Sequence, residues 1–79
     1  MERETVLFKT EEKMSRNEVA EMLRALADKI EKSKVVLQQG AKEVRLKIPD
    51  QVELKVKAEK EVGKRRTKKK LELEIEWRV

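Results

Sequence analysis

The last nine residues of the chain alternate apolar and charged side chains without interruption. The apolar positions are Leu71, Leu73, Ile75, Trp77 and Val79, and a Glu or an Arg stands between each of them. Because successive side chains of a β-strand point to opposite faces, this period of two predicts a strand with one apolar and one charged face. An earlier segment keeps the same period from residue 52 onward. The two segments predict a long antiparallel hairpin with strands 52–62 and 68–79.

The segment between these two strands is strongly basic. Residues 64–70 carry six of the 21 Lys and Arg side chains, and the rest of the chain carries 15 basic and 16 acidic side chains. The formal net charge of +5 therefore comes from one predicted hairpin turn. The candidate polyanion-binding residues in this turn are Lys64, Arg65, Arg66, Lys68, Lys69 and Lys70.

Pairing across the hairpin accounts for most of its alternating Lys and Glu residues. A register in which paired residue numbers sum to 131 places Leu54 opposite Trp77 on the apolar face. On the charged face it gives mostly opposite-charge pairs, which stabilise a sheet, and one repulsive pair, Glu59 opposite Glu72. A slide by two residues gives an equally favourable set of pairs. The charge pattern therefore predicts the pairing but leaves the register open.

A capping box marks the start of a helix at residue 16. Ser15 and Glu18 have the spacing in which the Ser hydroxyl accepts a first-turn N–H and the Glu carboxylate accepts the N–H of the Ser. Apolar residues then recur every three or four positions, as on one face of a helix. The pattern predicts a helix over residues 16–32.

Three shorter segments predict further strands. Residues 4–10 are rich in β-branched and aromatic side chains, which favour a strand. Residues 35–38 form a short apolar run, and residues 44–48 alternate again after a turn at 39–41. Pro49 begins the next turn, because its ring presets φ.

These elements predict an α+β fold with the order β-α-β-β-β-β, as a single domain over residues 1–79. Strands joined by short turns form an antiparallel sheet, and a sheet with one apolar face needs a second layer. We therefore expect one helix packed on a mostly antiparallel sheet of four or five strands.

The predicted core consists of the apolar residues on the inner faces of these elements. Trp77 lies on the apolar face of the last strand, where we interpret it as a core residue packed against the helix. Stacking of Trp77 on a ligand is the alternative. The predicted core residues are Val6, Phe8, Val19, Leu23, Leu26, Ile30, Leu46, Ile48, Leu54, Val56, Leu73, Ile75 and Trp77.

The combined pattern resembles the amphi-Trp domain family. It consists of the helix motif that begins with Ser15 and Glu18, the segment 48–56 with its Ile-Pro pair, and the terminal Leu-Glu-Leu-Glu-Ile-Glu-Trp of residues 71–77. The resemblance covers about residues 5–79, and the terminal motif is its most distinctive part. It implies a small prokaryotic, notably archaeal, domain with an amphipathic terminal strand. It implies no activity, cofactor or binding residue, and the basic run 64–70 is not part of the pattern.

The composition argues against catalysis. The chain contains no His and no Cys, and Ser15 is used as a helix cap, so a nucleophile with an adjacent base is missing. With only Gly40 and Gly63, there is no glycine-rich phosphate loop. We expect no enzymatic activity, no cofactor and no small-molecule substrate.

A row of glutamates on the last strand raises the question of a metal site. Glu72, Glu74 and Glu76 project from one face at intervals of about 7 Å, twice the rise per residue of a strand. A hard cation needs several convergent oxygen ligands, whereas a flat strand face disperses them. We interpret these residues as a charged face paired with lysines and expect no metal.

The remaining features concern location and source. No segment approaches the roughly 20 apolar residues of a membrane span, and residues 1–4 lack a signal-peptide pattern. We expect a cytoplasmic protein with no membrane partner. Charged residues make up 47% of the chain, mostly Lys and Glu, which is typical of a protein from a heat-loving organism.

Two functional hypotheses follow from the sequence. The leading one is a non-catalytic structural or protein-interaction module that associates with itself, because open sheet edges can pair with a second chain. The alternative is a small protein that binds nucleic acid or another polyanion through the basic turn 64–70. No aromatic side chains are interleaved with the basic ones, so such binding would lack base stacking and sequence specificity.

Overall fold

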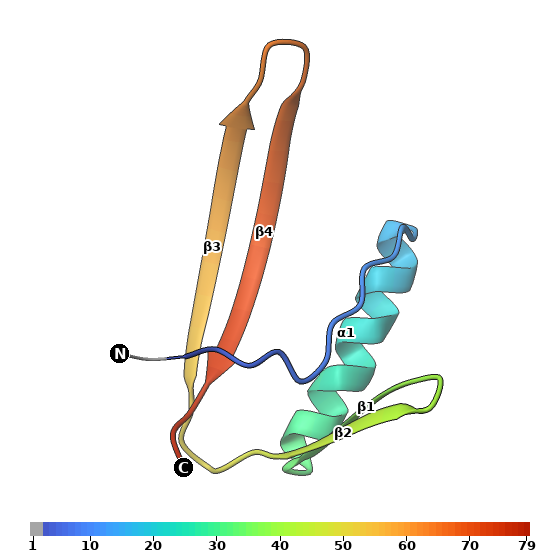
Figure 1. The fold of residues 1–79 in the computed structure, drawn as a ribbon, viewed down its shortest axis with the longest axis vertical. Helices are drawn as coiled ribbons and strands as arrows, with labels where there is room; N and C mark the ends of the chain where they lie inside the picture. The colour runs from blue at the N-terminus through green and yellow to red at the C-terminus, as the bar shows by residue number, and fades with distance from the viewer. Residues whose placement is uncertain (1–2) are drawn as a thin grey trace. The chain divides into compact units, whose positions relative to one another are not determined.

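The computed structural model describes residues 3–79 and shows one helix followed by four strands (Figure 1). The described chain divides between Ile48 and Pro49 into two compact units. The first contains the helix and one hairpin, and the second contains a longer hairpin. The elements are α1 (Arg16–Glu31), β1 (Lys34–Gln39), β2 (Lys42–Lys47), β3 (Glu53–Val62) and β4 (Thr67–Glu76).

The helix α1 begins where the capping box predicts. The Ser15 hydroxyl accepts the N–H of Glu18 at 3.1 Å, and the Glu18 carboxylate accepts the N–H of Ser15 at 3.2 Å. These two bonds satisfy N–H groups that the first turn of a helix leaves without partners. At the other end, Ser33 adopts a left-handed φ of 64°, and its N–H donates to the carbonyl of Ile30 at 2.9 Å. The predicted helix is confirmed.

The hairpin β1–β2 and the helix form the first unit. The strands pair antiparallel through a two-residue loop in which Gly40 has a φ of 58°, a conformation that glycine adopts without strain. Ile48, just after β2, donates its N–H to the carbonyl of Ser33 at 2.8 Å. The helix contacts β1, and Val35 and Ile48 are only 4% and 7% exposed. The core of this unit is therefore small and centred on the hairpin.

The hairpin β3–β4 has paired residue numbers that sum to 129, so Leu54 faces Ile75 and Val56 faces Leu73. This is the register reached by sliding the 131 arrangement by two residues, one of the alternatives that the charge pattern left open. The long hairpin is confirmed, but β4 ends at Glu76. Trp77 therefore lies beyond the ladder and has no partner strand residue among those described.

Two parts of the predicted architecture are wrong. Residues 4–10 form no strand, and the four strands form two separate two-stranded sheets instead of one. A single β-rich segment becomes a strand only when another strand supplies partners for its backbone groups. Pro49, which has no N–H to donate to a ladder, lies in the segment that joins the two hairpins.

The predicted core is mostly wrong as well. Of the thirteen predicted residues only Ile48 is buried, and the second buried residue, Val35, was not predicted. Six predicted core residues are half-buried: Phe8, Leu26, Ile30, Leu46, Ile75 and Trp77. The other six are exposed: Val6, Val19, Leu23, Leu54, Val56 and Leu73. Periodicity identified the apolar faces, but burial also requires an element that covers them.

Candidate functional site

The hairpin β3–β4 has one charged face, built by the alternation of both strands. Four directly paired positions bring a Lys opposite a Glu, such as Lys57 opposite Glu72. One pair is repulsive, Glu53 opposite Glu76, and Lys55 lies close to both carboxylates. The Lys55 ammonium is 2.7 Å from the Glu76 carboxylate and 3.7 Å from that of Glu53. A single lysine thus relieves the one repulsive pair on this face.

The ion pairs on this face shift the protonation equilibria of their members. A hydrogen bond and the charge of Glu76 raise the pKa of Lys55. Glu59, whose carboxylate is 2.8 Å from the Lys57 ammonium, has its pKa lowered by a hydrogen bond from that group, and the pKa of Lys57 is raised by the same bond. In the same way, a hydrogen bond to Glu72 at 3.0 Å raises the pKa of Lys70. Because all these groups are exposed, the pairs contribute little stability individually.

The opposite face of the hairpin is apolar, and no element of its own unit covers it. No residue of β3 or β4 is buried. Ile75 on this face is half-buried, and five other large apolar side chains are between 53% and 72% exposed: Leu54, Val56, Val62, Leu71 and Leu73. Large exposed apolar patches are unusual on soluble monomers, and here the Lys60–Lys69 pair separates Val62 from the other four residues. We call these five residues the apolar stripe.

The structure separates the six predicted polyanion-binding residues into three groups. The hairpin turn is shorter than the predicted 64–70, since it comprises residues 63–66 and β4 begins at Thr67. Lys64, Arg65 and Arg66 lie in this turn. Lys68 and Lys70 lie on the charged face of β4 and Lys69 on the face of the apolar stripe, because alternate residues of a strand point to opposite sides.

The two lysines on the charged face have acidic neighbours. Lys68 is paired across the strands with Glu61, and Lys70 with Glu59. Lys70 also forms the ion pair with Glu72. Positive charge on this face is therefore compensated within the hairpin, which leaves it less available to an external anion.

One cation near the turn was not predicted from the sequence. Lys60 pairs directly with Lys69, and both lie on the face of the apolar stripe, beside Val62. Like charges directly opposite each other are destabilising. The signal was present in the sequence, because Lys60 and Lys69 occupy positions where the alternation calls for an apolar residue. Together with Lys64, Arg65 and Arg66, these residues form a cluster of five cations, which we call the turn cluster.

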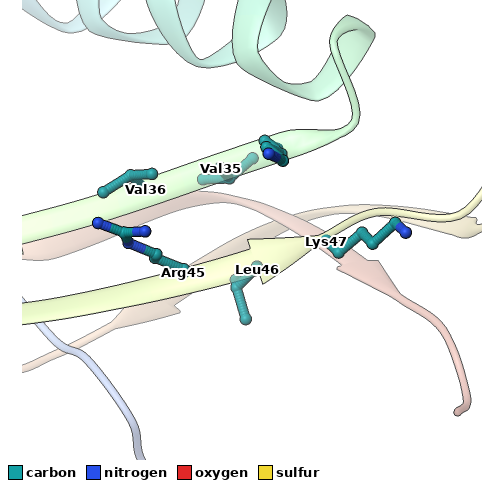
Figure 2. A pocket seen from close by; sticks show the side chains of 6 residues that line it. Val35, Val36, Arg45, Leu46 and Lys47 are labelled. Carbon is teal, nitrogen blue, oxygen red and sulfur yellow. The ribbon is translucent and has the colours of Figure 1, made fainter.

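A hollow lies in the other hairpin, between β1 and β2 (Figure 2). It has a volume of about 180 Å³, and its polar side chains are those of Lys34, Arg45 and Lys47. Arg45 also donates to the carboxylate of Glu43 at 3.4 Å. The lining contains neither a hydroxyl nor a carboxylate, and all its charged side chains are basic.

Two further classes of site do not occur within residues 3–79. In that part of the chain, no three acidic side chains converge as metal ligands. Glu72 and Glu76, two of the glutamates on β4, instead contact lysines. Nor does the described chain contain a helix long and apolar enough to cross a bilayer.

The fold and this hairpin define a small α+β domain that ends in an amphipathic β-ribbon followed by a Trp. The chain belongs to the Amphi-Trp domain family, whose pattern matches residues 1–79. The resemblance inferred from the terminal Leu-Glu-Leu-Glu-Ile-Glu-Trp motif is thereby confirmed. No curated protein matches the sequence. No solved structure matches it either.

Proposed function

We propose that this protein is a non-catalytic interaction module that associates with itself through the β3–β4 hairpin. The observation that supports this proposal is the exposure of the apolar stripe, whose five side chains are 53–72% exposed on strands without a single buried residue. Burial of apolar surface is the dominant favourable term in protein association. The stripe therefore provides the driving force, and the charged face keeps the other side of the hairpin in water.

The physical weakness of an isolated hairpin supports the same proposal. A single two-stranded hairpin is marginally stable in water, and independent stability requires a third strand or a packed layer. The paired lysines and glutamates add only a few tenths of a kcal/mol each at exposed positions, so they do not replace that layer. A second copy of the chain supplies the missing surface.

The residue types present support a role without catalysis. The chain has no His and no Cys, and the hydroxyl of Ser15 is occupied by the capping hydrogen bond. A carboxylate needs burial or unusual surroundings to act in acid–base catalysis, whereas Glu59 is exposed and its pKa is lowered by a lysine. We therefore propose an interaction role without enzymatic activity or cofactor.

Sedimentation velocity of two matched double variants tests this proposal. V56T/L73T replaces a directly paired position of the apolar stripe, and K57T/E59T replaces an ion pair on the charged face of β3. Threonine preserves strand propensity, and neither variant changes the net charge. We expect the wild type and K57T/E59T to associate with rising concentration, and V56T/L73T to remain monomeric with an unchanged helix signal in circular dichroism.

Two results would contradict the proposal. One is a wild-type protein that stays monomeric from about 1 μM to 1 mM, a range that covers weak and strong association. The other is equal association of all three proteins, which would show that the apolar stripe plays no part.

Polyanion binding is the second candidate function, and the turn cluster favours it. None of its five members, Lys60, Lys64, Arg65, Arg66 and Lys69, forms an ion pair within residues 3–79. Cations without a protein partner can neutralise phosphates and release their counterions. Lys68 and Lys70 complete the set predicted from the sequence, but they face glutamates across the hairpin.

A salt titration with fluorescent duplex DNA and RNA tests the second candidate. We expect K64Q/R65Q/R66Q to lower the dependence of log K on log salt by about 0.9 for each phosphate that is no longer neutralised, and K68Q/K70Q to lower it less. Replacement of all six predicted residues with Gln should abolish binding. Failure of the wild type to bind near physiological salt would eliminate this candidate and leave the first one unaffected.

A further inference from the structure

The charged positions of β4 are divided by sign along the strand. Arg66, just before the strand, and Lys68 and Lys70 within it are basic, and the next three positions of the same parity are Glu72, Glu74 and Glu76. The strand thus has a basic half and an acidic half. An antiparallel second copy reverses the order of the two halves.

We propose that two copies of this chain pair β4 with β4 antiparallel, about a two-fold axis at Leu71. In this register paired residue numbers sum to 142. It places Arg66 opposite Glu76, Lys68 opposite Glu74 and Lys70 opposite Glu72, and the symmetry repeats each pair. All six cross-strand charge contacts are then attractive, which stabilises pairing. The inference rests on the self-association proposed above and adds a strand edge to the apolar stripe as a surface through which two copies associate.

The backbone of β4 is available for this pairing. Within residues 3–79 the hairpin is a two-stranded sheet, so the outer edge of β4 has no partner strand. The N–H of Gly63 donates to the carbonyl of Arg66 at 2.9 Å, which identifies a hydrogen-bonded position of the ladder. Hydrogen-bonded and non-hydrogen-bonded positions alternate in an antiparallel ladder, so Lys69, Leu71 and Leu73 direct their backbone groups to the outer edge. Leu71 would exchange two hydrogen bonds with its counterpart.

The intrachain ion pairs favour β4 over β3 as the pairing edge. β3 also has a self-complementary register, about Ala58. The charges next to the axis contact each other within each strand, Lys57 and Glu59 at 2.8 Å in β3 and Lys70 and Glu72 at 3.0 Å in β4. The next charges outward differ, because Lys55 of β3 already contacts Glu53 and Glu76. In β4, by contrast, Lys68 and Glu74 form no ion pair within the described chain. The β4 register supplies partners to charges that lack them.

The same charge pattern selects one register among several. A shift of two in either direction places Lys70 opposite Lys70 or Glu72 opposite Glu72 at the two-fold axis. Parallel in-register pairing of two β4 strands places each charged residue beside the identical residue of the second copy, so all these contacts are repulsive. Repulsion in the alternatives is a known means by which sheet edges gain specificity.

The product of this pairing would be a four-stranded antiparallel sheet. Residues 67–75 of each copy would be in register, which is nearly the whole of β4. Three or more strands with a common apolar face are the threshold for independent stability. The two apolar stripes, with Leu71 of each copy adjacent at the axis, would then form one continuous surface.

Cysteine cross-linking tests the position of the axis, because the chain contains no cysteine of its own. Residues paired at a two-fold axis of this kind have Cα atoms about 5.5 Å apart, which a disulfide can bridge. The matched control for L71C is A58C, since Ala58 is the cross-strand partner of Leu71 on the same face. At a concentration where the wild type is associated, we expect L71C to form a disulfide-linked dimer with diamide at least tenfold faster than A58C. Equal rates, or faster cross-linking of A58C, would overturn the proposal.

Exchange of charges within the hairpin tests the pairing itself. The variant K68E/K70E/E59K/E61K makes all four charged-face positions 68, 70, 72 and 74 acidic. The variant E72K/E74K/K55E/K57E makes the same four positions basic. Both keep the net charge of +5 and the four directly opposite Lys–Glu pairs of the hairpin, while the second variant also removes the Lys55 contacts with Glu53 and Glu76. Each variant alone should associate at least tenfold more weakly than the wild type at low salt, and a mixture of the two should form heterodimers as tightly as the wild type.

The outcomes separate this inference from the proposed function. If the wild type associates but each charge-exchanged variant associates equally well alone, the β4 edge is not the interface and the interaction module stands. If the wild type does not associate, both fail.

Discussion

The two hairpins of this protein share an antiparallel topology but differ in what covers them. The hairpin β1–β2 is contacted by α1, and the two buried apolar residues, Val35 and Ile48, belong to its unit. The hairpin β3–β4 is longer and has no buried residue, although its alternation of apolar and charged side chains is more regular. Regular alternation of apolar and charged residues therefore identifies the apolar face of a strand. Burial of that face also requires another helix or strand that packs on it.

The two hairpins also differ in the interactions that fix their strand pairing. In the first unit, a backbone hydrogen bond from Ile48 to Ser33 and the packing of Val35 fix the strands. In the second, the register is accompanied by cross-strand Lys–Glu pairs on an exposed face. Packing contributes kcal/mol per residue, whereas exposed charge pairs contribute tenths. The second hairpin is thus well specified but weakly stabilised, which is the physical basis for its proposed association.

The largest predicted effect is on the covered hairpin. V35A should lower the free energy of unfolding by about 2 kcal/mol, because it removes buried methyl groups and leaves a cavity. V56A, the matched variant on the apolar stripe, should change it by less than about 0.5 kcal/mol in dilute, monomeric protein. Urea unfolding followed by circular dichroism measures both. Equal effects would show that the two hairpins are packed alike.

An intermediate effect is expected at the junction between α1 and β1. Ser33 has a φ of 64°, and a left-handed conformation costs a non-glycine residue about 1 kcal/mol. S33G should therefore stabilise the first unit by about that amount, whereas S33A should not. Thermal unfolding measures the difference, and destabilisation by S33G would mean that the Ser side chain itself has a structural role at this helix end.

The smallest effect is a pH dependence confined to β3–β4. The pKa of Glu59 lies below its usual value of 4.5, so its contribution to stability is present above that pH and is lost as the pH falls further. The pKa values of Lys55, Lys57 and Lys70 lie above 10.5, so their contributions are present below that pH and are lost as the pH rises further. Amide chemical shifts of β3–β4 should be constant between these limits and change beyond them. A transition near neutral pH would contradict this assignment of the charges.

The sequence predicted the local structure better than the arrangement of the elements. The capping box of Ser15 and Glu18 located the helix start, and the alternation located β3 and β4, because both signals act over a few residues. The charge pattern allowed two registers, because opposite-charge pairs repeat every two residues along the hairpin. The single sheet and the core failed, because each depends on which distant element covers an apolar face.

For the candidate site, too, the sequence predicted the residues better than their arrangement. The six basic residues were found from composition, but their division among the turn, the charged face and the apolar face depended on where the turn ends. A turn of residues 63–66 places Lys69 opposite Lys60, and that neighbour is 9 positions away in the sequence. The division of β4 into a basic half and an acidic half is also visible in the sequence. Only the structure shows that the outer edge of this strand has no partner within residues 3–79, which makes pairing with a second copy possible.

Amide hydrogen exchange of the wild-type protein at several concentrations tests the central claim most directly. The account predicts that protection of β1 and β2 is independent of concentration, whereas protection of β3 and β4 rises with it. Within β4, the rise should be greatest at Lys69, Leu71 and Leu73, whose N–H groups point to the outer edge. Equal and concentration-independent protection of the two hairpins would contradict the claim that the β3–β4 hairpin is an interaction surface.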